Sequence, residues 1–244
     1  MLVMLIQDLD RTSDSPYVER VWRYHSEGGG SFISIAECRS ELVVTRHHGR
    51  VTVTVRGPET RATAASYPPD AQWLGIRLKP GASLRTRPAE QLVDRGVSLP
   101  EAVRGSFWLD GSAWQVPDYE NVEVFVSQLI RAGLLVIDPA VTTALRGELT
   151  DVSPRTVQRR FRQATGLTRS TAQQIERARY AALLLMRGVP IVDATHEAGY
   201  YDQPHLTRSF KRLIGQTPTD VRRNGSLQLS FLYKTRPSHR SGRQ

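Results

Sequence analysis

Cysteine is almost missing from the 244-residue sequence, in which Cys38 is the only one. A single cysteine cannot form an internal disulfide or a zinc site built from cysteines, and it is typical of a reducing compartment. No run approaches the roughly 18 consecutive apolar residues of a membrane helix. Residues 1–10 carry acidic side chains where a signal peptide would carry basic ones. We therefore expect a cytoplasmic protein that neither uses disulfides nor enters a membrane.

Lysine is also scarce, because 30 of the 33 basic residues are arginines. Arginine's forked donors suit phosphates and guanine edges, although a GC-rich genome would also enrich arginine. The charges are unevenly distributed: residues 1–137 hold 15 basic and 16 acidic side chains, whereas residues 138–244 hold 18 and 8. The second half alone is therefore suited to a polyanion such as nucleic acid.

The composition is otherwise that of a globular protein. Hydrophobic residues make up 39% of the chain and charged residues 23%, which excludes a collagen-like or wholly disordered chain. At roughly 100–200 residues per domain, the length favours two modest domains.

The first half is predicted to be mainly strands. In residues 51–55 valine alternates strictly with threonine, as in a half-buried strand. Residues 42–45 precede it across a glycine-containing stretch, residues 47–50, which predicts a hairpin. Further strands are expected at residues 31–37 and 73–78. Helices are expected at residues 88–95, 99–103 and 118–131, the last with Asp118 as its N-cap.

The pattern becomes entirely helical from Asp138 and Pro139, which are typical of a helix start. A second cap and proline stand at Ser153 and Pro154. The later helices are expected at residues 170–187, with a capping box of Ser170 and Gln173, at residues 191–197, after Asp202, and after Thr217. Residues 227–233 are expected to form a short strand or a docked segment in a basic tail.

Residues 191–212 have the spacing of two helices joined by a turn at Gly199, an arrangement whose second helix enters the DNA major groove. Four side chains are expected to point away from the apolar stripe of the second helix: Gln203, Pro204, Thr207 and Arg208. Glutamine can bind adenine, arginine can bind guanine, and threonine or proline can contact the thymine methyl. The alternative is an ordinary solvated helix face.

A second copy of this design favours DNA binding over the solvated face. Residues 153–163 place an apolar stripe opposite Arg155, Gln158, Arg159 and Arg162. The long helix between the two copies would hold them near one duplex turn apart, about 34 Å.

Residues 188–218 resemble the C-terminal signature of AraC/XylS-type transcription regulators. The small residue Ala194, the turn at Gly199, the Arg-x-Phe-Lys run from Arg208, and the Gly-x-Thr-Pro run at residues 215–218 lie in the family register. Residues 153–166 resemble the first recognition helix of the family, and the resemblance covers roughly residues 138–223. It implies two helix-turn-helix units that read successive major grooves, with the outward side chains above, apart from Arg162, as DNA contacts. Arg162 is expected to contact phosphate.

The sequence departs from this family before Ser153. Where the family has a small helix and a glycine turn, residues 141–151 are shorter, and Asp151 stands in the usual glycine position. The first unit is therefore expected to be the weaker reader.

In the first half, Tyr17 and Val18 with Trp22, and residues 74–81, resemble the β-rich sensor domains that precede such DNA-binding units. The four tryptophans of this half, Trp22, Trp73, Trp108 and Trp114, could line an apolar effector pocket, and the alternative is core packing.

Catalytic or metal chemistry has little support in this half. His47 and His48 are adjacent and have no carboxylate at ligand spacing, so a loop pair is favoured over a metal site. Cys38 lacks an evident activating base or resolving thiol, so a buried structural cysteine is favoured over a nucleophile. We expect no catalysis, no cofactor and no metal.

The sequence therefore predicts an α+β sensor or dimerisation domain at residues 1–137, an all-α DNA-binding domain at residues 138–223, and a basic tail at residues 224–244. The predicted function is a sequence-specific transcription regulator that binds double-stranded DNA, with a small-molecule effector and a homodimer left open. Two alternatives remain: an enzymatic or ligand-modifying first domain that works through Cys38 or His47, and a ligand-independent dimeric regulator.

Overall fold

The computed structural model describes residues 5–146 and 153–224. Asp151, the predicted segment at residues 227–233 and the tail from residue 225 onward lie outside the described residues. Among the residues that are described, no helix is long and apolar enough to cross a membrane.

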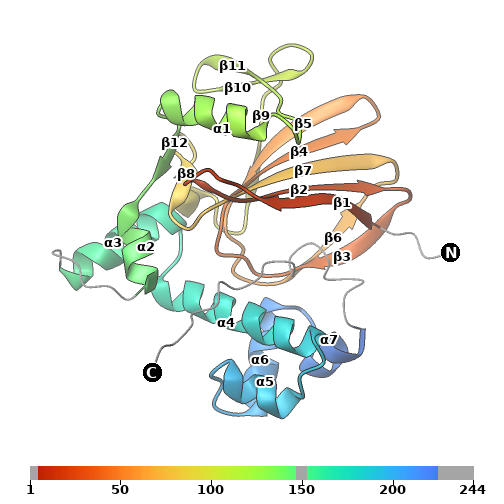
Figure 1. The fold of residues 1–244 in the computed structure, drawn as a ribbon, viewed down its shortest axis with the longest axis vertical. Helices are drawn as coiled ribbons and strands as arrows, with labels where there is room; N and C mark the ends of the chain where they lie inside the picture. The colour runs from red at the N-terminus through yellow and green to blue at the C-terminus, as the bar shows by residue number, and fades with distance from the viewer. Residues whose placement is uncertain (1–4, 147–152, 225–244) are drawn as a thin grey trace. The chain divides into compact units, whose positions relative to one another are not determined.

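Strands dominate up to residue 137 and helices follow, which confirms the predicted fold class (Figure 1). The strands are β1 (Leu5–Thr12), β2 (Val18–Ser26), β3 (Gly30–Ser34), β4 (Glu41–His47), β5 (Arg50–Arg56), β6 (Thr63–Tyr67), β7 (Ala71–Leu78), β8 (Ala82–Leu84), β9 (Gly96–Leu99), β10 (Ser106–Leu109), β11 (Ser112–Gln115) and β12 (Leu135–Ile137). The helices are the short 3-10 helix η1 (Ala89–Gln91), α1 (Val122–Arg131), α2 (Pro139–Arg146), α3 (Pro154–Thr165), α4 (Arg169–Met186), α5 (Ile191–Glu197), α6 (Gln203–Leu213) and α7 (Pro218–Asn224).

Six of the strands form one sheet in the order β1-β2-β7-β4-β5-β9, and each pairing is antiparallel. In β5 the predicted alternation is present, since Val53 and Val55 are each 2% exposed and Thr52 faces solvent. The β4–β5 turn contains His48 at φ 48° and Gly49 at φ 74°. Two consecutive positive φ angles are typical of the tight hairpin turn whose twist matches the strands.

One face of this sheet carries the hydrophobic core of the first part. Helix α1 and the β10–β11 hairpin lie beside the sheet (Figure 1), and their buried residues belong to the same cluster as those of β4, β5 and β7. The Phe125 ring meets the rings of Phe107 and Trp114 edge-on, at centroid distances of 6.2 and 6.5 Å. Such edge-to-face pairs stabilise aromatic packing beyond area burial.

The opposite sheet face contains buried charges. Arg77 in β7 donates from Nε to Glu41 of β4 at 2.6 Å, and its Nη1 lies 3.8 Å from Glu37. Burial alone would lower the pKa of the Arg77 guanidinium, but the two carboxylates outweigh it and raise that pKa above its ordinary value. Arg77 is therefore a fixed cation inside the sheet domain.

Three of the expected helices in the first half differ from the structure. Residues 99–103 are not helical, because Leu99 ends edge strand β9, which pairs with β5. Residues 88–95 contain only the single turn of η1. Helix α1 begins at Val122 rather than after Asp118, whose carboxylate instead accepts the backbone N–H groups of Glu120 and Asn121 in the preceding turn.

By its contacts the chain divides into two compact units. The first comprises residues 1–31, 36–60 and 66–176, and the second comprises residues 32–35, 61–65 and 177–244. Helix α4 supplies residues to both units. The domain boundary expected at residue 137 remains a prediction.

Candidate nucleic-acid interface

Helix α6 is fixed at its start by Asp202. The Asp202 carboxylate accepts a hydrogen bond from the His205 backbone N–H at 2.7 Å. Pro204 lies in the first turn, where the backbone N–H that proline lacks would have no partner within the helix. Leu206, Phe210 and Leu213 are fully buried along one side of the helix. The remaining sides of α6 are therefore free to carry polar groups.

The four predicted reading residues of α6 lie on one outward face. Gln203, Pro204 and Arg208 are exposed, and Thr207 is half-buried. The Thr207 hydroxyl donates to the Gln203 carbonyl at 2.9 Å, so it is occupied within the helix. The Arg208 guanidinium and the Gln203 amide are the polar groups on this face best suited to base edges.

The turn before α6 is held by residues from three elements. Gly199 has φ +72°, which only glycine adopts without strain, and the Tyr200 N–H donates to Thr195 at 2.9 Å. Tyr200 is 3% exposed, and its hydroxyl hydrogen-bonds to Ser209 of α6 at 2.9 Å. Burial raises the pKa of the Tyr200 hydroxyl, which therefore stays protonated at neutral pH.

Arg177 of α4 contributes to the same turn, which the sequence did not reveal. Its guanidinium lies 4.5 Å from the centre of the Tyr200 ring and donates to the Gly199 carbonyl at 3.2 Å. Because Arg177 is 22 residues away from Gly199, no local pattern indicates this contact. A residue of the long helix α4 thus helps to hold the turn that precedes α6.

Helix α3 has the caps predicted for it. The Ser153 side chain accepts the Thr156 N–H at 3.3 Å, and Gly166 ends the helix at φ 74°. Phe161 and Thr165 are buried. The four predicted contact residues of this helix are all exposed: Arg155, Gln158, Arg159 and Arg162.

One arginine of α3 has a different role. Arg160 donates to both carboxylate oxygens of Asp138, at 2.7 and 3.0 Å, and Asp138 also caps α2 through the Ala140 N–H at 2.9 Å. A paired guanidinium is less available to a phosphate. Arg160 therefore joins α3 to the start of α2 and is not part of the outward face.

A known family model matches the part of the chain that contains α3, α4, α5, α6 and α7. Residues 148–224 match the model described as "Helix-turn-helix domain". Residues 148–224 are called the helix-turn-helix domain below, after that model. The resemblance to AraC/XylS-type regulators is confirmed for this part of the chain.

Curated relatives of the helix-turn-helix domain are regulators. The chain is 37% identical over 90 residues to the HTH-type transcriptional regulator RipA of Corynebacterium glutamicum. The aligned residues make up 36% of this chain and 27% of the relative. The chain is 33% identical over 92 residues to Regulatory protein ada of Salmonella typhimurium, covering 38% of this chain and 26% of the relative. The matched part is thus about a quarter of each relative's length. No solved structure matches the chain.

The start of the linking helix α4 differs by two residues from the prediction. Thr168, rather than Ser170, caps it, and its hydroxyl accepts the Thr171 N–H at 3.1 Å. Helix α4 therefore spans Arg169–Met186 within the helix-turn-helix domain. Gly188, at φ 86°, follows its end as predicted.

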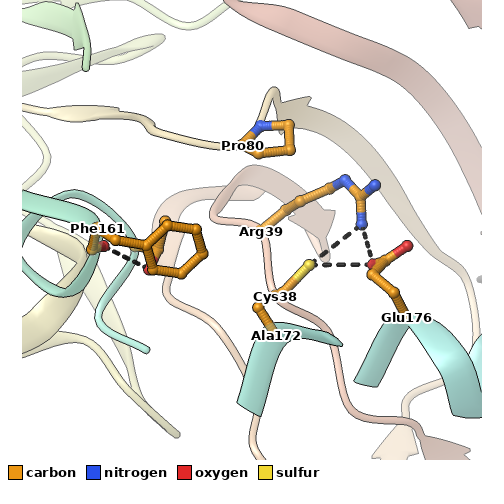
Figure 2. A pocket seen from close by; sticks show the side chains of 7 residues that line it. Cys38, Arg39, Pro80, Phe161, Ala172 and Glu176 are labelled. Atoms are coloured by element: carbon orange, nitrogen blue, oxygen red, sulfur yellow. Dashed lines mark hydrogen bonds and ion pairs between the residues drawn. The ribbon is translucent and has the colours of Figure 1, made fainter. Parts of the chain in front are cut away.

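Cys38 lies in a pocket of the first unit, beside a cluster of charges (Figure 2). Its sulfur donates to a Glu176 carboxylate oxygen at 3.0 Å, and Arg39 donates to that same oxygen at 2.7 Å. Arg39 also pairs with Glu19 at 2.7 Å and Glu37 at 3.0 Å. Arg39 is thus the cation that these three carboxylates share.

This environment does not activate Cys38. Burial, with Glu176 nearby, raises the pKa of the Cys38 thiol well above its usual range. A nucleophilic cysteine needs the opposite shift. Ligand atoms of Glu37, Cys38 and Glu176 lie within 4.8 Å of one another, as in a metal site, but Arg39 contacts all three residues.

The tryptophans lie in two separate places. Trp22 and Trp73 are on neighbouring strands β2 and β7, and Trp22 packs over Gly75, where an added Cβ would lie 1.9 Å from the indole. Trp114 packs on Phe125 in the core, whereas Trp108 is 46% exposed. The effector-pocket prediction remains untested.

His47 and His48 lie at the β4–β5 turn, with ring centroids 4.0 Å apart. His47 is the last residue of β4, and only His48 lies in the turn itself. Among the described residues, neither histidine belongs to a group of three potential metal ligands.

Proposed function

We propose that the chain is a sequence-specific, DNA-binding transcription regulator in which α6 reads bases in a major groove. The observation that carries this proposal is the outward face of α6, with Gln203 and Arg208 exposed above a fully buried stripe. The family of residues 148–224 and the regulators similar to it support the same role.

Phosphate contacts would come from exposed arginines on other surfaces. Arg155, Arg159 and Arg162 are exposed on α3, and Arg222 and Arg223 are exposed at the end of α7. Such contacts fix the position of the protein on the duplex without reading sequence. In this proposal α3 contributes mainly affinity and α6 mainly specificity.

The domain organisation we propose keeps residues 1–137 as the sensor or dimerisation domain, residues 138–223 as the DNA-binding domain and residues 224–244 as a basic tail. A regulator of this kind would act in the cytoplasm, where the DNA is. Homodimer formation would place two reading domains on one operator.

Control by a small molecule is the finer part of the proposal. Segments 32–35 and 61–65 of the first half belong to the same compact unit as α5, α6 and α7. The Ala62 N–H donates to the Arg212 carbonyl at the end of α6 at 2.8 Å. A ligand that shifts these segments would therefore shift the reading helix.

A thermal-shift screen of small metabolites on the full chain tests this control. A ligand present at about 100 times its dissociation constant stabilises the folded state by about 2.7 kcal/mol. A stabilising metabolite that also changes DNA affinity supports a sensor. If no compound in a broad screen has either effect, the alternative of a ligand-independent dimeric regulator is favoured.

We propose no catalytic activity. The rival function, an enzymatic or ligand-modifying first domain, would work through Cys38 or His47, and the raised pKa of Cys38 disfavours it. Loss of DNA-dependent regulation in a Cys38→Ser or His47→Ala variant that folds normally would favour the rival.

Arg208→Ala is expected to weaken binding to the preferred duplex by about 1–3 kcal/mol and to relax the preference at one base position, because a bidentate base contact is lost. Arg222→Ala is the matched control and should weaken binding to all sequences alike. Affinities of the full chain for a selected duplex and its single-base variants measure both effects. A uniform loss in Arg208→Ala would make Arg208 a phosphate contact and contradict the assignment of the α6 face.

Gln158→Ala is expected to change base preference less than Arg208→Ala, because the sequence departs from the family before α3. Substituting each base of the binding site should reveal one stringent major-groove segment and a weaker one about 10 base pairs away. Two equally stringent segments would mean that the first unit reads bases as fully as the second.

A further inference from the structure

Tyr201 has a surface position that the proposed α6 face does not explain. Its side chain is 89% exposed, more than that of any other large hydrophobic residue in the described part of the chain. It stands between buried Tyr200 and the N-cap Asp202, at the end of the turn that leads into α6. A large aromatic side chain that is not buried in the core at this point is available to contact a partner.

The backbone on both sides of Tyr201 is fixed. On one side the Tyr200 N–H bonds to Thr195 at 2.9 Å, and its hydroxyl bonds to Ser209 at 2.9 Å. On the other side Asp202 caps α6 through the His205 N–H. The Cα of Tyr201 is therefore held in place before any partner arrives, which reduces the entropy lost on binding.

The start of α6 offers few backbone donors to a phosphate. A helix N-terminus usually binds phosphate through its free N–H groups. Here Pro204 has no N–H, the His205 N–H is occupied by Asp202, and the Asp202 carboxylate itself adds negative charge. A side chain is therefore the better donor to a phosphate near this end of the reading helix.

We propose that Tyr201 is a DNA-contact residue whose hydroxyl donates to a backbone phosphate flanking the bases that α6 reads, while its ring covers the adjacent sugar. This inference rests on the proposed function. Tyrosine is among the side chains that bond to phosphate oxygens in protein–DNA complexes. Because the contact is neutral, it adds affinity without displacing counterions, unlike an arginine contact.

The test uses the full chain and a duplex selected from a random library, with affinity measured by fluorescence anisotropy over a range of salt concentrations. The variants are Tyr201→Phe and Tyr201→Ala. Val124→Ala is the matched control, because Val124 is 58% exposed on α1, outside the helix-turn-helix domain. Thermal unfolding checks that each variant folds as the parent does.

We expect Tyr201→Ala to lower affinity about tenfold or more and Tyr201→Phe to lower it severalfold, since a hydrogen bond to a charged group is stronger than a neutral one. The salt slope and the base preference should stay those of the parent. Val124→Ala should bind as the parent does. Arg222→Ala, by contrast, should reduce the salt slope by about one.

Three results would overturn the inference. Affinity of Tyr201→Ala within twofold of the parent would exclude a DNA contact. If Tyr201→Phe binds as tightly as the parent, the phosphate hydrogen bond is excluded. If either Tyr201 variant changes the base preference at one position of the duplex, Tyr201 contacts a base instead. If the parent chain itself selects no duplex, the proposed function fails, and that outcome is distinct from a failure of Tyr201 alone.

Discussion

Raising the salt concentration from about 50 to about 200 mM is expected to weaken DNA binding by about a thousandfold. If the chain neutralises about six phosphates, the slope of log K against log salt is near −5. We expect most of these contacts to come from the exposed arginines of α3 and α7: Arg155, Arg159, Arg162, Arg222 and Arg223. Fluorescence anisotropy with a labelled duplex measures the slope directly.

The control for this prediction is an arginine in residues 1–137, where basic and acidic side chains are nearly equal in number. Arg104 is exposed in that half, so Arg104→Ala should leave the salt slope unchanged, whereas Arg155→Ala should reduce its magnitude by about one. A slope near zero, or an equal effect of both variants, would contradict the assignment of the second half to the polyanion.

Arg77→Ala is expected to lower the free energy of unfolding by about 3–5 kcal/mol, because it leaves the buried Glu41 carboxylate without its cation. The Arg77 side chain is 3% exposed, and Glu41 and Glu37 beside it are 11% and 7% exposed. Urea unfolding, followed by tryptophan fluorescence, measures the loss, since Trp22 and Trp73 lie on this sheet.

Arg85→Ala provides the matched comparison. Arg85 pairs with Asp110 at 3.2 Å, but the two side chains are 58% and 41% exposed. Exposed pairs contribute at most about 1 kcal/mol, so this variant should unfold nearly as the parent does. If Arg77→Ala and Arg85→Ala lower the free energy of unfolding by similar amounts, burial does not make the Arg77 ion pair more important for stability than the Arg85 pair.

The helical part could be predicted from the sequence because its signals are local. Ser153 and Asp202 cap their helices with side chains three residues from their partners, and Gly166, Gly188 and Gly199 adopt the positive φ angles that end helices. The outward face of α6 follows from the spacing of its buried residues. These features need no knowledge of distant contacts.

The first half was less predictable because its stabilising contacts are not local. Arg39 and Glu176 are 137 residues apart, and Arg77 and Glu41 are 36 apart, so no window of sequence indicates either pair. The mistaken helix at residues 99–103 has the same origin. Leu99 pairs with Val53 of β5 and Glu101 forms a bridge with Phe107, so partners outside the segment set its conformation rather than local propensity.

Arg177 and Tyr201 illustrate the same limit within the candidate site. The Arg177 hydrogen bond to the Gly199 carbonyl joins residues that are 22 apart in the sequence. Tyr200 is buried, whereas its neighbour Tyr201 is 89% exposed. Two adjacent tyrosines cannot be told apart by composition or periodicity alone.

The central claim, that this chain recognises a specific duplex through α6, is tested most directly by one competition measurement. The full chain is bound to a duplex selected from a random library at about 150 mM salt, and a scrambled duplex of equal length competes. We predict that the selected duplex binds at least about a thousandfold more tightly, and that Arg208→Ala narrows this ratio. Equal affinity for the two duplexes would contradict the account.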